Sequence, residues 1–302
     1  MVDYDLIIVG AGPAGMTAGI YAARYKMSVL ILSKDLGGMA STAHKVVNYP
    51  GFNEITGLEL MQKFEKQAKD LGVKFAYQEV LKIKPDKTSG GFVVETKKGN
   101  YACKKIIYAG GSKRIELGAK GEKEFLGKGV SYCSTCDAGF YKNKNVSVIG
   151  GSNAALTSAL LVSKYAKKVY LIHRGSDFQK AEPSWIEEVE KNKKIEVKFN
   201  EEVVEIYGSK FVEGVKLKSG NGLDCEGVFI EIGGVPQSYV LESLGLKMNK
   251  SGFIITDKEQ RTNINGFYSA GDVTDNVLKQ IITACGEGSV AVLSAYRDLK
   301  KK

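Results

Sequence analysis

The sequence predicts an α/β fold made of two Rossmann-like nucleotide-binding domains, the second inserted into the first. Two stretches of the chain carry this prediction, because each reads as strand, glycine-rich turn, helix and strand. A third observation is a short strand pattern that ends at Gly271-Asp272 and leads into another helix over residues 280–296. If that strand returns to the first sheet, the first domain covers residues 1–114 and 245–302, and residues 115–244 form the insertion.

The first unit opens with an apolar run at residues 6–9, which is followed at once by a glycine-rich turn over residues 10–15. A helix is expected over residues 16–25 and the next strand over residues 28–32. A lone glycine pattern is a weak signal. Its place between a strand and a helix makes it a credible dinucleotide site.

Each glycine of this turn has a physical role. Gly10 makes the turn, Gly12 lets the backbone approach a pyrophosphate, and Gly15 lets the helix pack on the strand. The free N–H groups at the start of the helix then face the phosphates. A side chain near the end of the second strand often holds the ribose, and the two candidates here are Ser33 and Asp35.

A similar unit follows about 140 residues later, with strands expected over residues 145–149 and 169–172 and a helix over residues 154–165. Its turn departs from the pattern, because Ser152 stands where the second glycine should be. The serine side chain occupies space that a pyrophosphate needs for close approach to the backbone. The second turn is therefore predicted to be impaired as a phosphate site.

The sharpest chemical signal is Cys133-Ser-Thr-Cys136-Asp137. Two intervening residues let the sulfur atoms meet in a tight ring, and one thiol of such a pair has a lowered pKa. Asp137 can act as an acid or base for a departing thiolate. Half of a zinc site is disfavoured, because the other cysteines are isolated and neither His44 nor His173 lies at ligand spacing. The pair predicts redox catalysis without a metal.

The chain is basic, with 43 Lys and Arg against 34 Asp and Glu and a net charge of +9. Only five of these residues are Arg, and no basic helix is interleaved with aromatic residues, which argues against nucleic acid. No apolar run approaches the ~18 residues of a membrane span, and the first residues are acidic where a signal peptide is basic. We therefore expect a cytoplasmic protein that does not bind membranes.

The excess charge lies on residues 1–114 and 245–302, which hold 26 basic and 16 acidic side chains against 17 and 18 in the insertion. A solvated lysine surface explains part of it. The alternative is an acidic protein partner steered to the first domain.

These motifs together resemble the low-molecular-weight thioredoxin reductases, a family of FAD-containing dithiol enzymes, over nearly the whole chain. The resemblance implies FAD on the first domain, with the three turn glycines at the pyrophosphate and Asp272 at the ribityl chain. Gly38, Asn48 and Gln280 complete the expected cofactor-binding set. The motifs that carry the resemblance, in family order, are Gly10 to Gly15, Gly37-Gly38, Asn48-Tyr-Pro-Gly51, Cys133 to Asp137, Gly233 to Pro236 and Ala270 to Val273.

The resemblance also assigns roles to the cysteines and implies partners. Cys136 would face the flavin, and Cys133 would attack the protein disulfide of thioredoxin. A homodimer is implied, as is a rotation of the second domain that carries the dithiol from the flavin to the partner.

Departures from the family pattern concern the electron donor. The family usually has a glycine at the position of Ser152, and arginines at those of Gly175 and Gln179 that grip the 2′-phosphate of NADPH. No acidic residue ends that strand to hold a ribose, so NADH gains no support. Such losses resemble the pyridine-nucleotide-independent branch, whose members take electrons from reduced ferredoxin or a deazaflavin.

We expect reduced ferredoxin as the donor, with a deazaflavin and NAD(P)H as alternatives. At about −400 mV for a plant-type ferredoxin and about −270 mV for thioredoxin, two electrons release roughly 6 kcal/mol. A dithiol oxidase, which passes electrons to oxygen, is the alternative activity. A non-catalytic flavin protein is disfavoured by the intact Cys-x-x-Cys-Asp motif.

Overall fold

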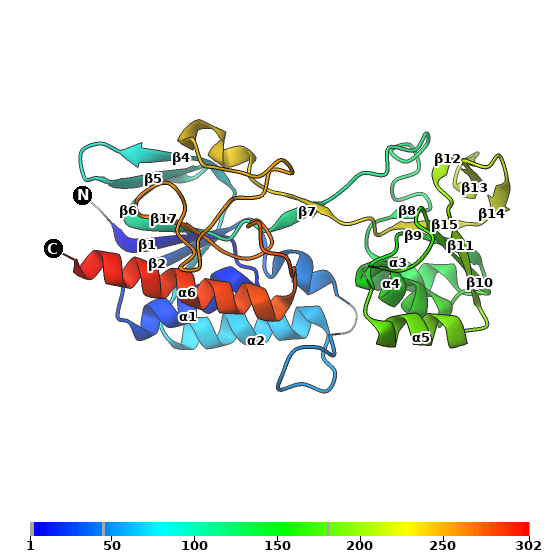
Figure 1. Cartoon of the computed structure of the whole chain (residues 1–302), viewed down its shortest axis with the longest axis horizontal. Coiled ribbons are helices and arrows are strands. Elements are labelled where there is room, and N and C mark those ends of the chain that lie inside the picture. Colours follow the sequence, from blue (N-terminus) through cyan, green and yellow to red (C-terminus); the bar gives the residue numbers. More distant parts are fainter. Residues whose placement is uncertain (1–2, 44–45, 180, 302) are drawn as a thin grey trace. The chain divides into compact units, whose positions relative to one another are not determined.

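The computed structural model describes residues 3–43, 46–179 and 181–301 (Figure 1). His44, considered above as a metal ligand, lies outside the described residues. Contacts divide the chain into two compact units: the first comprises residues 3–41, 46–113 and 235–301, and the second comprises residues 42–43, 114–179 and 181–234. The α/β fold class predicted from the sequence is confirmed.

The first unit is built on a seven-stranded sheet. Its parallel part carries the first glycine turn, and its antiparallel part is a meander at one edge. The carboxyl-terminal strand does return to this sheet, because β17 pairs in parallel with β6. The strands in spatial order are β3 (Lys74–Tyr77), β2 (Val29–Ser33), β1 (Tyr4–Val9), β6 (Gly99–Tyr108), β5 (Gly91–Thr96) and β4 (Val80–Asp86), with β17 (Phe267–Ser269) beside β6.

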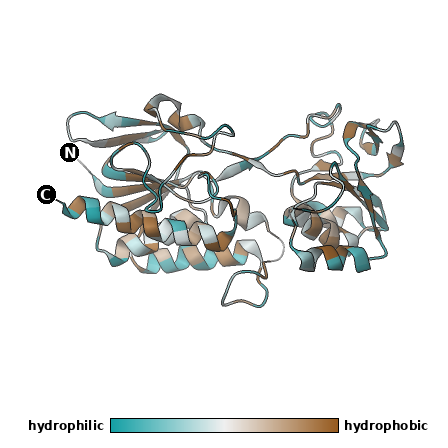
Figure 2. Cartoon of the chain, viewed as in Figure 1, coloured by the Kyte–Doolittle hydropathy of each residue, from teal (hydrophilic) through white to brown (hydrophobic). Residues whose placement is uncertain are grey.

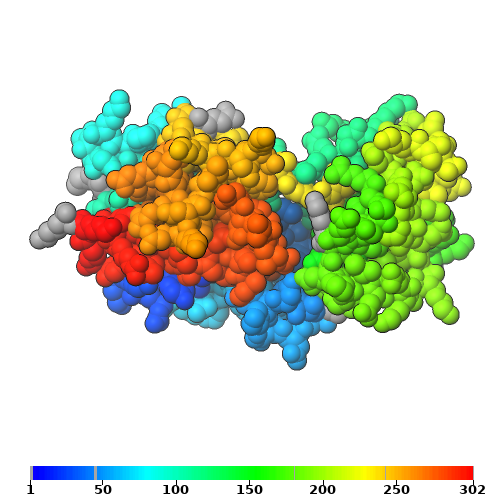
Figure 3. Space-filling model, viewed as in Figure 1, coloured from blue at the N-terminus to red at the C-terminus, as the bar shows by residue number. Residues whose placement is uncertain are grey.

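Three helices lie together on one face of this sheet, as Figure 1 shows: α1 (Pro13–Arg24), α2 (Gly57–Asp70) and α6 (Ile281–Lys300). Helix α1 begins three residues before the position predicted, because Gly12 is its N-cap and proline is favoured in the first turn. A capping box between Thr56 and Glu59 starts α2. In Figure 3, α6 and the segment before it, in orange and red, occupy the middle of the visible face of this unit.

The core of the first unit lies between the sheet and its coverings, and the central strands are strongly apolar in Figure 2. Val240 and Leu241, on the 3-10 helix η3 (Tyr239–Leu244), are buried in this core with Ile254 and Phe267. The units therefore divide between Gly234 and Val235, earlier than the boundary at residue 244 expected from the sequence.

The second unit has a five-stranded parallel sheet. The chain leaves β9 toward β10 on one side and later returns to β15 on the other. In such sheets ligands bind outside the carboxyl ends of the strands where the order reverses, here between β9 and β15. The order is β11 (Ile195–Phe199), β10 (Lys168–His173), β9 (Asn145–Ile149), β15 (Gly227–Ile230) and β8 (Val130–Ser131).

Helices α4 (Asn153–Ser163) and α5 (Pro183–Lys191) pack on this sheet. Helix α4 lies close to the range predicted for it, residues 154–165, whereas no prediction covers α5. Two smaller sheets complete the chain. One contains β12 (Val203–Gly208), β13 (Val212–Leu217) and β14 (Gly222–Asp224), and the other pairs β7 (Ser112–Arg114) with β16 (Gly234–Pro236). Among the described helices, none is long and apolar enough to cross a membrane.

Candidate active site

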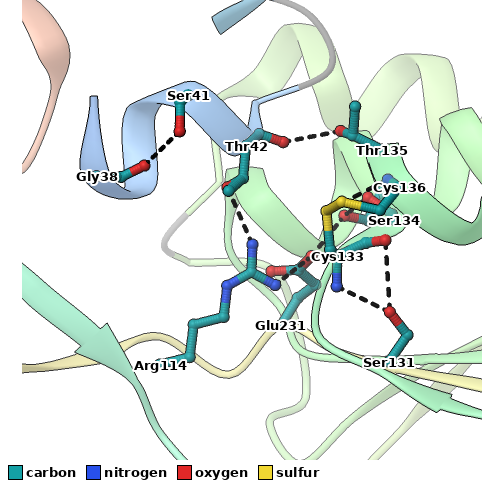
Figure 4. Close-up of a disulfide and its surroundings, with 11 residues drawn as sticks. Gly38, Ser41, Thr42, Arg114, Ser131, Cys133, Ser134, Thr135, Cys136 and Glu231 are labelled. Atoms are coloured by element: carbon teal, nitrogen blue, oxygen red, sulfur yellow. Dashed lines mark hydrogen bonds and ion pairs between the residues drawn. A yellow bond between two sulfur atoms is a disulfide. The ribbon is translucent and has the colours of Figure 1, made fainter. Parts of the chain in front are cut away.

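Cys133 and Cys136 form a disulfide, with their Cα atoms 5.3 Å apart (Figure 4). The short helix α3 (Ser134–Asp137) sets this geometry, because Cys133 is its N-cap. The backbone N–H of Cys136 donates to Sγ of Cys133 over 3.2 Å. Ser131 fixes the backbone of Cys133, since the Oγ of Ser131 accepts from the backbone N–H of Cys133 over 2.9 Å. The local hydrogen bonds therefore hold the sulfurs together.

Asp137 lies beside the disulfide. It lines a cavity of about 450 Å³ whose wall also includes Cys133, Tyr132, Arg114 and Leu126. Of the described residues that form this wall, Asp137 alone carries a carboxylate. A thiolate released at this cavity can therefore exchange a proton with it.

A chain of buried polar side chains leads away from α3 (Figure 4). Oγ of Ser134 lies 2.8 Å from Oγ of Ser158 on α4, which donates to Oε1 of Glu231 over 3.0 Å. Arg114 places Nη1 3.5 Å from the same oxygen. Burial raises the pKa of Glu231, while the charge of Arg114 and the hydrogen bond from Ser158 oppose that rise.

The crevice of the second unit lacks the usual features of a phosphate site. Ser152 is the N-cap of α4, which begins one residue before the position predicted. The next residue, Asn153, donates from Nδ2 to Oε1 of Glu182 over 2.9 Å and accepts from the backbone N–H of Glu182 over 2.7 Å. A carboxylate thus lies at the first turn of α4, where a helix N-terminus favours an anion.

The residues after β10 offer little cationic charge. The side chain of Gln179, at one of the missing arginine positions, donates to Oδ2 of Asp177 over 3.4 Å. Gly175, at the other, has no side chain. Arg174 is exposed and is the one arginine of residues 173–179.

In the first unit, the glycine turn follows β1 at the carboxyl edge of the parallel strands. Gly10 has φ = +112°, and a Cβ there would lie 2.8 Å from the carbonyl carbon of Ala109. A Cβ at Gly15 would lie 3.0 Å from the carbonyl carbon of Gly10. Around Gly12, by contrast, a Cβ would meet no described protein atom nearer than 3.9 Å. The packing therefore requires Gly10 and Gly15 and leaves Gly12 open, as a pyrophosphate site needs.

The other predicted cofactor residues fall on the same unit. Ser33 ends β2 and donates from Oγ to the carbonyl oxygen of Asp35 over 2.7 Å, and the side chain of Asp35 is exposed. Gly38 begins the 3-10 helix η1 (Gly38–Thr42). Because the carboxyl ends of β1, β2 and β17 share one edge, Ser33, Asp35 and the residues after β17 lie toward the glycine turn.

Two predicted residues far apart in sequence meet in the fold. Nδ2 of Asn48 donates to Oε1 of Gln280 over 3.2 Å. Gln280 is the N-cap of α6. Both had been assigned to the flavin through the family resemblance, and the fold places them side by side.

Asp272 follows β17 and is partly buried. Burial raises the pKa of its carboxyl, and the charge of Lys279 opposes that rise. The loop around it is fixed by Glu287 of α6, which accepts from the backbone N–H of Gly271 over 2.6 Å and from Oγ1 of Thr274 over 3.2 Å. These contacts fit a residue held ready to contact a bound cofactor.

Sequence reasoning missed the carboxylates Glu231, Glu182 and Glu287. Two of them had a readable signal. Glu231 interrupts the apolar strand pattern Val-Phe-Ile-Glu-Ile, and Glu287 is the one acid in the small-residue half of α6. A buried acid in such surroundings points to a specific partner. Glu182 had no comparable signal, because it lies in a polar segment.

The fold and the site define a class of protein. It is an α/β protein with a glycine turn of the dinucleotide-binding kind in one unit and a Cys-x-x-Cys disulfide in the other. The chain belongs to the pyridine nucleotide-disulphide oxidoreductase family, because the sequence model of that family matches residues 4–288.

Its relatives are more specific. It is 38% identical to a thioredoxin reductase of Listeria innocua over 99% of this chain and 94% of that one. It is 41% identical to the solved T. acidophilum thioredoxin reductase, with 99% of both chains covered and a TM-score of 0.93. A ferredoxin-flavin thioredoxin reductase of Clostridium acetobutylicum is 34% identical over 99% of both chains, with a TM-score of 0.54. The chain is therefore an FAD-binding oxidoreductase, and the predicted enzyme class and cofactor are confirmed.

Proposed function

We propose that the chain is an FAD-dependent disulfide reductase that passes electrons through the Cys133–Cys136 pair to thioredoxin, with reduced ferredoxin as the donor. The observation that carries the choice of donor is the state of the second unit. Its turn has Ser152 in place of a glycine, its arginines are replaced by Gly175 and Gln179, and Glu182 lies at the start of α4.

Electrostatics argue against a dinucleotide in this crevice. A pyrophosphate is an anion and needs the N–H groups at the first turn of α4. There the carboxylate of Glu182 is bonded to Asn153, and a second carboxylate, Glu231, directly follows β15. Like charges at such short range raise the free energy of a bound phosphate. Of the arginine forks that would offset this repulsion, two are replaced by Gly175 and Gln179, and Arg174 remains.

Two observations favour ferredoxin. The similarity to the ferredoxin-flavin thioredoxin reductase of Clostridium acetobutylicum covers nearly the whole of both chains. The segments that build the first unit carry the excess of basic side chains, which suits an acidic protein that docks there. The potential difference also permits the transfer, at roughly 6 kcal/mol downhill.

In this proposal, each residue of the site has a separate role in binding the cofactor or in disulfide exchange. The turn of Gly10, Gly12 and Gly15 would hold the pyrophosphate, and Asp272 the ribityl chain; the bound flavin accepts single electrons and gives them up as a pair. Two electrons open the disulfide. The Cys133 thiolate then attacks one sulfur of the substrate disulfide, and the other sulfur leaves as a thiolate that takes a proton from Asp137. Cys136 attacks the resulting mixed disulfide, which releases the second thiol and restores the Cys133–Cys136 bond.

An anaerobic titration of the oxidised holoenzyme tests the donor. NADPH, NADH and reduced ferredoxin are added separately while the flavin absorbance is followed. We expect reduced ferredoxin to bleach the flavin, and rapid bleaching by stoichiometric NADPH would refute the proposal. The Cys136→Ser variant is the control: without the disulfide it should take up one electron pair, where the native enzyme takes up two.

Other activities of the same site have their own readouts. A deazaflavin- or NAD(P)H-dependent thioredoxin reductase would show its donor in the same titration. A dithiol oxidase would make hydrogen peroxide from a small dithiol and oxygen. We further propose a homodimer in the cytoplasm, which sedimentation and cell fractionation can check.

A further inference from the structure

A line of three buried hydrogen-bonding side chains connects the disulfide segment to the end of β15. Ser134, directly after Cys133, bonds Ser158 over 2.8 Å, and Ser158 bonds Glu231 over 3.0 Å. The exposed fractions of the three residues are 6%, 5% and 9%. All three belong to the second unit. We call them the Ser134–Glu231 chain.

The charge of Glu231 sets the direction of these hydrogen bonds. An ionised carboxylate only accepts, and a hydroxyl has a single proton to donate. Ser158 must therefore give its proton to Glu231 and accept from Ser134, whose proton then points away from the cysteines. A protonated Glu231 can itself donate, which reverses the chain and frees the Ser134 proton.

The stability of a cysteine thiolate depends on the direction of the hydrogen bonds in the Ser134–Glu231 chain. Opening the disulfide creates a thiolate next to Ser134, and a thiolate is stabilised by nearby donors and destabilised by nearby negative charge. An ionised Glu231 supplies the negative charge and directs the Ser134 donor elsewhere. A protonated Glu231 removes both effects.

The other described groups close to Glu231 come from β7 and from the turn after β9. Arg114 of β7 places Nη1 3.5 Å from Oε1, and a Cβ at Gly150, in the turn after β9, would lie 2.9 Å from the carbonyl carbon of Glu231. From α3 and α4 come Ser134 and Ser158, while Asp137 of α3 lines the cavity beside Cys133. Burial raises the pKa of Glu231 despite Arg114 and Ser158, so its proton is exchanged nearer to neutral pH than that of an exposed glutamate.

We propose that Glu231 is a positioning residue that takes up a proton, relayed through Ser158 and Ser134, when the Cys133–Cys136 disulfide is reduced. The two electrons come from the donor and break the S–S bond, one proton from solvent makes one thiol, and a second proton goes to Glu231. The other cysteine stays a thiolate, ready to attack. This inference rests on the disulfide reductase activity of the site.

The test measures alkylation of the holoenzyme, reduced by a phosphine, with iodoacetamide across pH. Glu231→Gln keeps the shape and removes the charge. At a pH where the native Glu231 holds the relayed proton, the native enzyme and the variant should react alike. At higher pH, where the native carboxylate is ionised again, the variant's cysteine pair should react about three- to tenfold faster, because no negative charge opposes its thiolate. The native profile should show a second step that the variant lacks. Unchanged kinetics in the variant would overturn the proposal.

The matched control is Glu122→Gln. Glu122 is a buried carboxylate of the same unit, 3% exposed, which accepts from the backbone N–H groups of Leu117 and Gly118 and from the hydroxyl of Tyr132, the neighbour of Cys133. It therefore lies near the cysteines but outside the Ser134–Glu231 chain. Its alkylation rate should stay within about twofold of native, the scatter expected for an uncoupled site. An equal acceleration in both variants would show a general charge effect and refute a role for the chain.

Infrared difference spectra, reduced minus oxidised, give a second readout. The native enzyme should gain the C=O stretch of a protonated carboxyl, and Glu231→Gln should lose that gain. If Glu231→Gln does not fold, Asp137→Asn decides: the band must persist, and its absence would overturn the proposal. Neither measurement uses ferredoxin or thioredoxin, so failure here leaves the proposed donor and substrate untouched.

Discussion

Helix α6 packs against α1 through Gly288, and this contact yields a quantitative prediction. A Cβ at Gly288 would overlap the carbonyl oxygen of Ala14 and lie 3.0 Å from its carbonyl carbon and 3.2 Å from its Cα. Carbon atoms pack at about 3.5–4.0 Å, so α6 would have to move away from α1 by about 0.5–1 Å. The backbone of Ala14 cannot yield, because it lies in the first turn of α1, directly after the glycine turn.

Gly288→Ala should therefore destabilise the protein. Overpacking costs about 1–3 kcal/mol, and the better helix propensity of alanine offsets about 0.5–1 kcal/mol of it. The net loss is about 0.5–2 kcal/mol. The displaced turn should also weaken FAD retention by about tenfold, which corresponds to ~1.4 kcal/mol.

Gly286, on the same helix, is the matched control. It is exposed, and a Cβ there would meet no described atom within 4 Å. Gly286→Ala should stabilise the protein by about 0.5–1 kcal/mol through helix propensity and the unfolded state. Urea unfolding of both holoenzymes, followed by circular dichroism and flavin release, measures the difference. A Gly288→Ala variant as stable as Gly286→Ala would refute the packing argument.

Two further predictions concern charge. Burial of Asp298 is outweighed by hydrogen bonds from Arg261 and Tyr268, so its pKa is lowered to about 2. The folded pKa lies below the unfolded value, so the Asp298–Arg261 pair stabilises the protein above pH ~4 and loses this contribution as pH falls toward 2. Because solvent screens this partly exposed pair, the contribution is on the order of 1 kcal/mol. Asp298→Asn should remove this contribution at pH 7 and flatten the stability curve at acid pH; an unaltered curve would contradict the assignment. Turnover with reduced ferredoxin should fall at least about tenfold from low to high salt, because attraction to the basic first unit is screened. A salt-insensitive rate would leave those lysines as a solvated surface.

Much of the fold could be read from short stretches of sequence. Gly10, Gly12 and Gly15 form a recognisable pattern within one turn, although Gly10 also packs against the distant Ala109. Cys133 and Cys136 are held by hydrogen bonds from residues within a few positions. Signals of this range survive without knowledge of the rest of the chain. The α/β class and the redox pair were predictable for that reason.

Other features depended on partners distant in sequence. Asn48 meets Gln280 across 232 positions, and Glu231 meets Ser158 across 73. Contacts divide the units after residue 234, where the sequence suggested 244, because Val240 and Leu241 are buried against strands far from them in the chain.

The sequence by itself predicted a pyrophosphate-type turn at Gly10 to Gly15 and a redox pair at Cys133 and Cys136, because both depend on local backbone geometry. The tertiary structure alone decided which carboxylates surround these places. Glu182 reaches the start of α4, Glu231 reaches the serines beside the disulfide, and Glu287 holds the loop of Asp272. The free energy of a buried charge depends on the groups that surround it, and those groups are brought together only by folding.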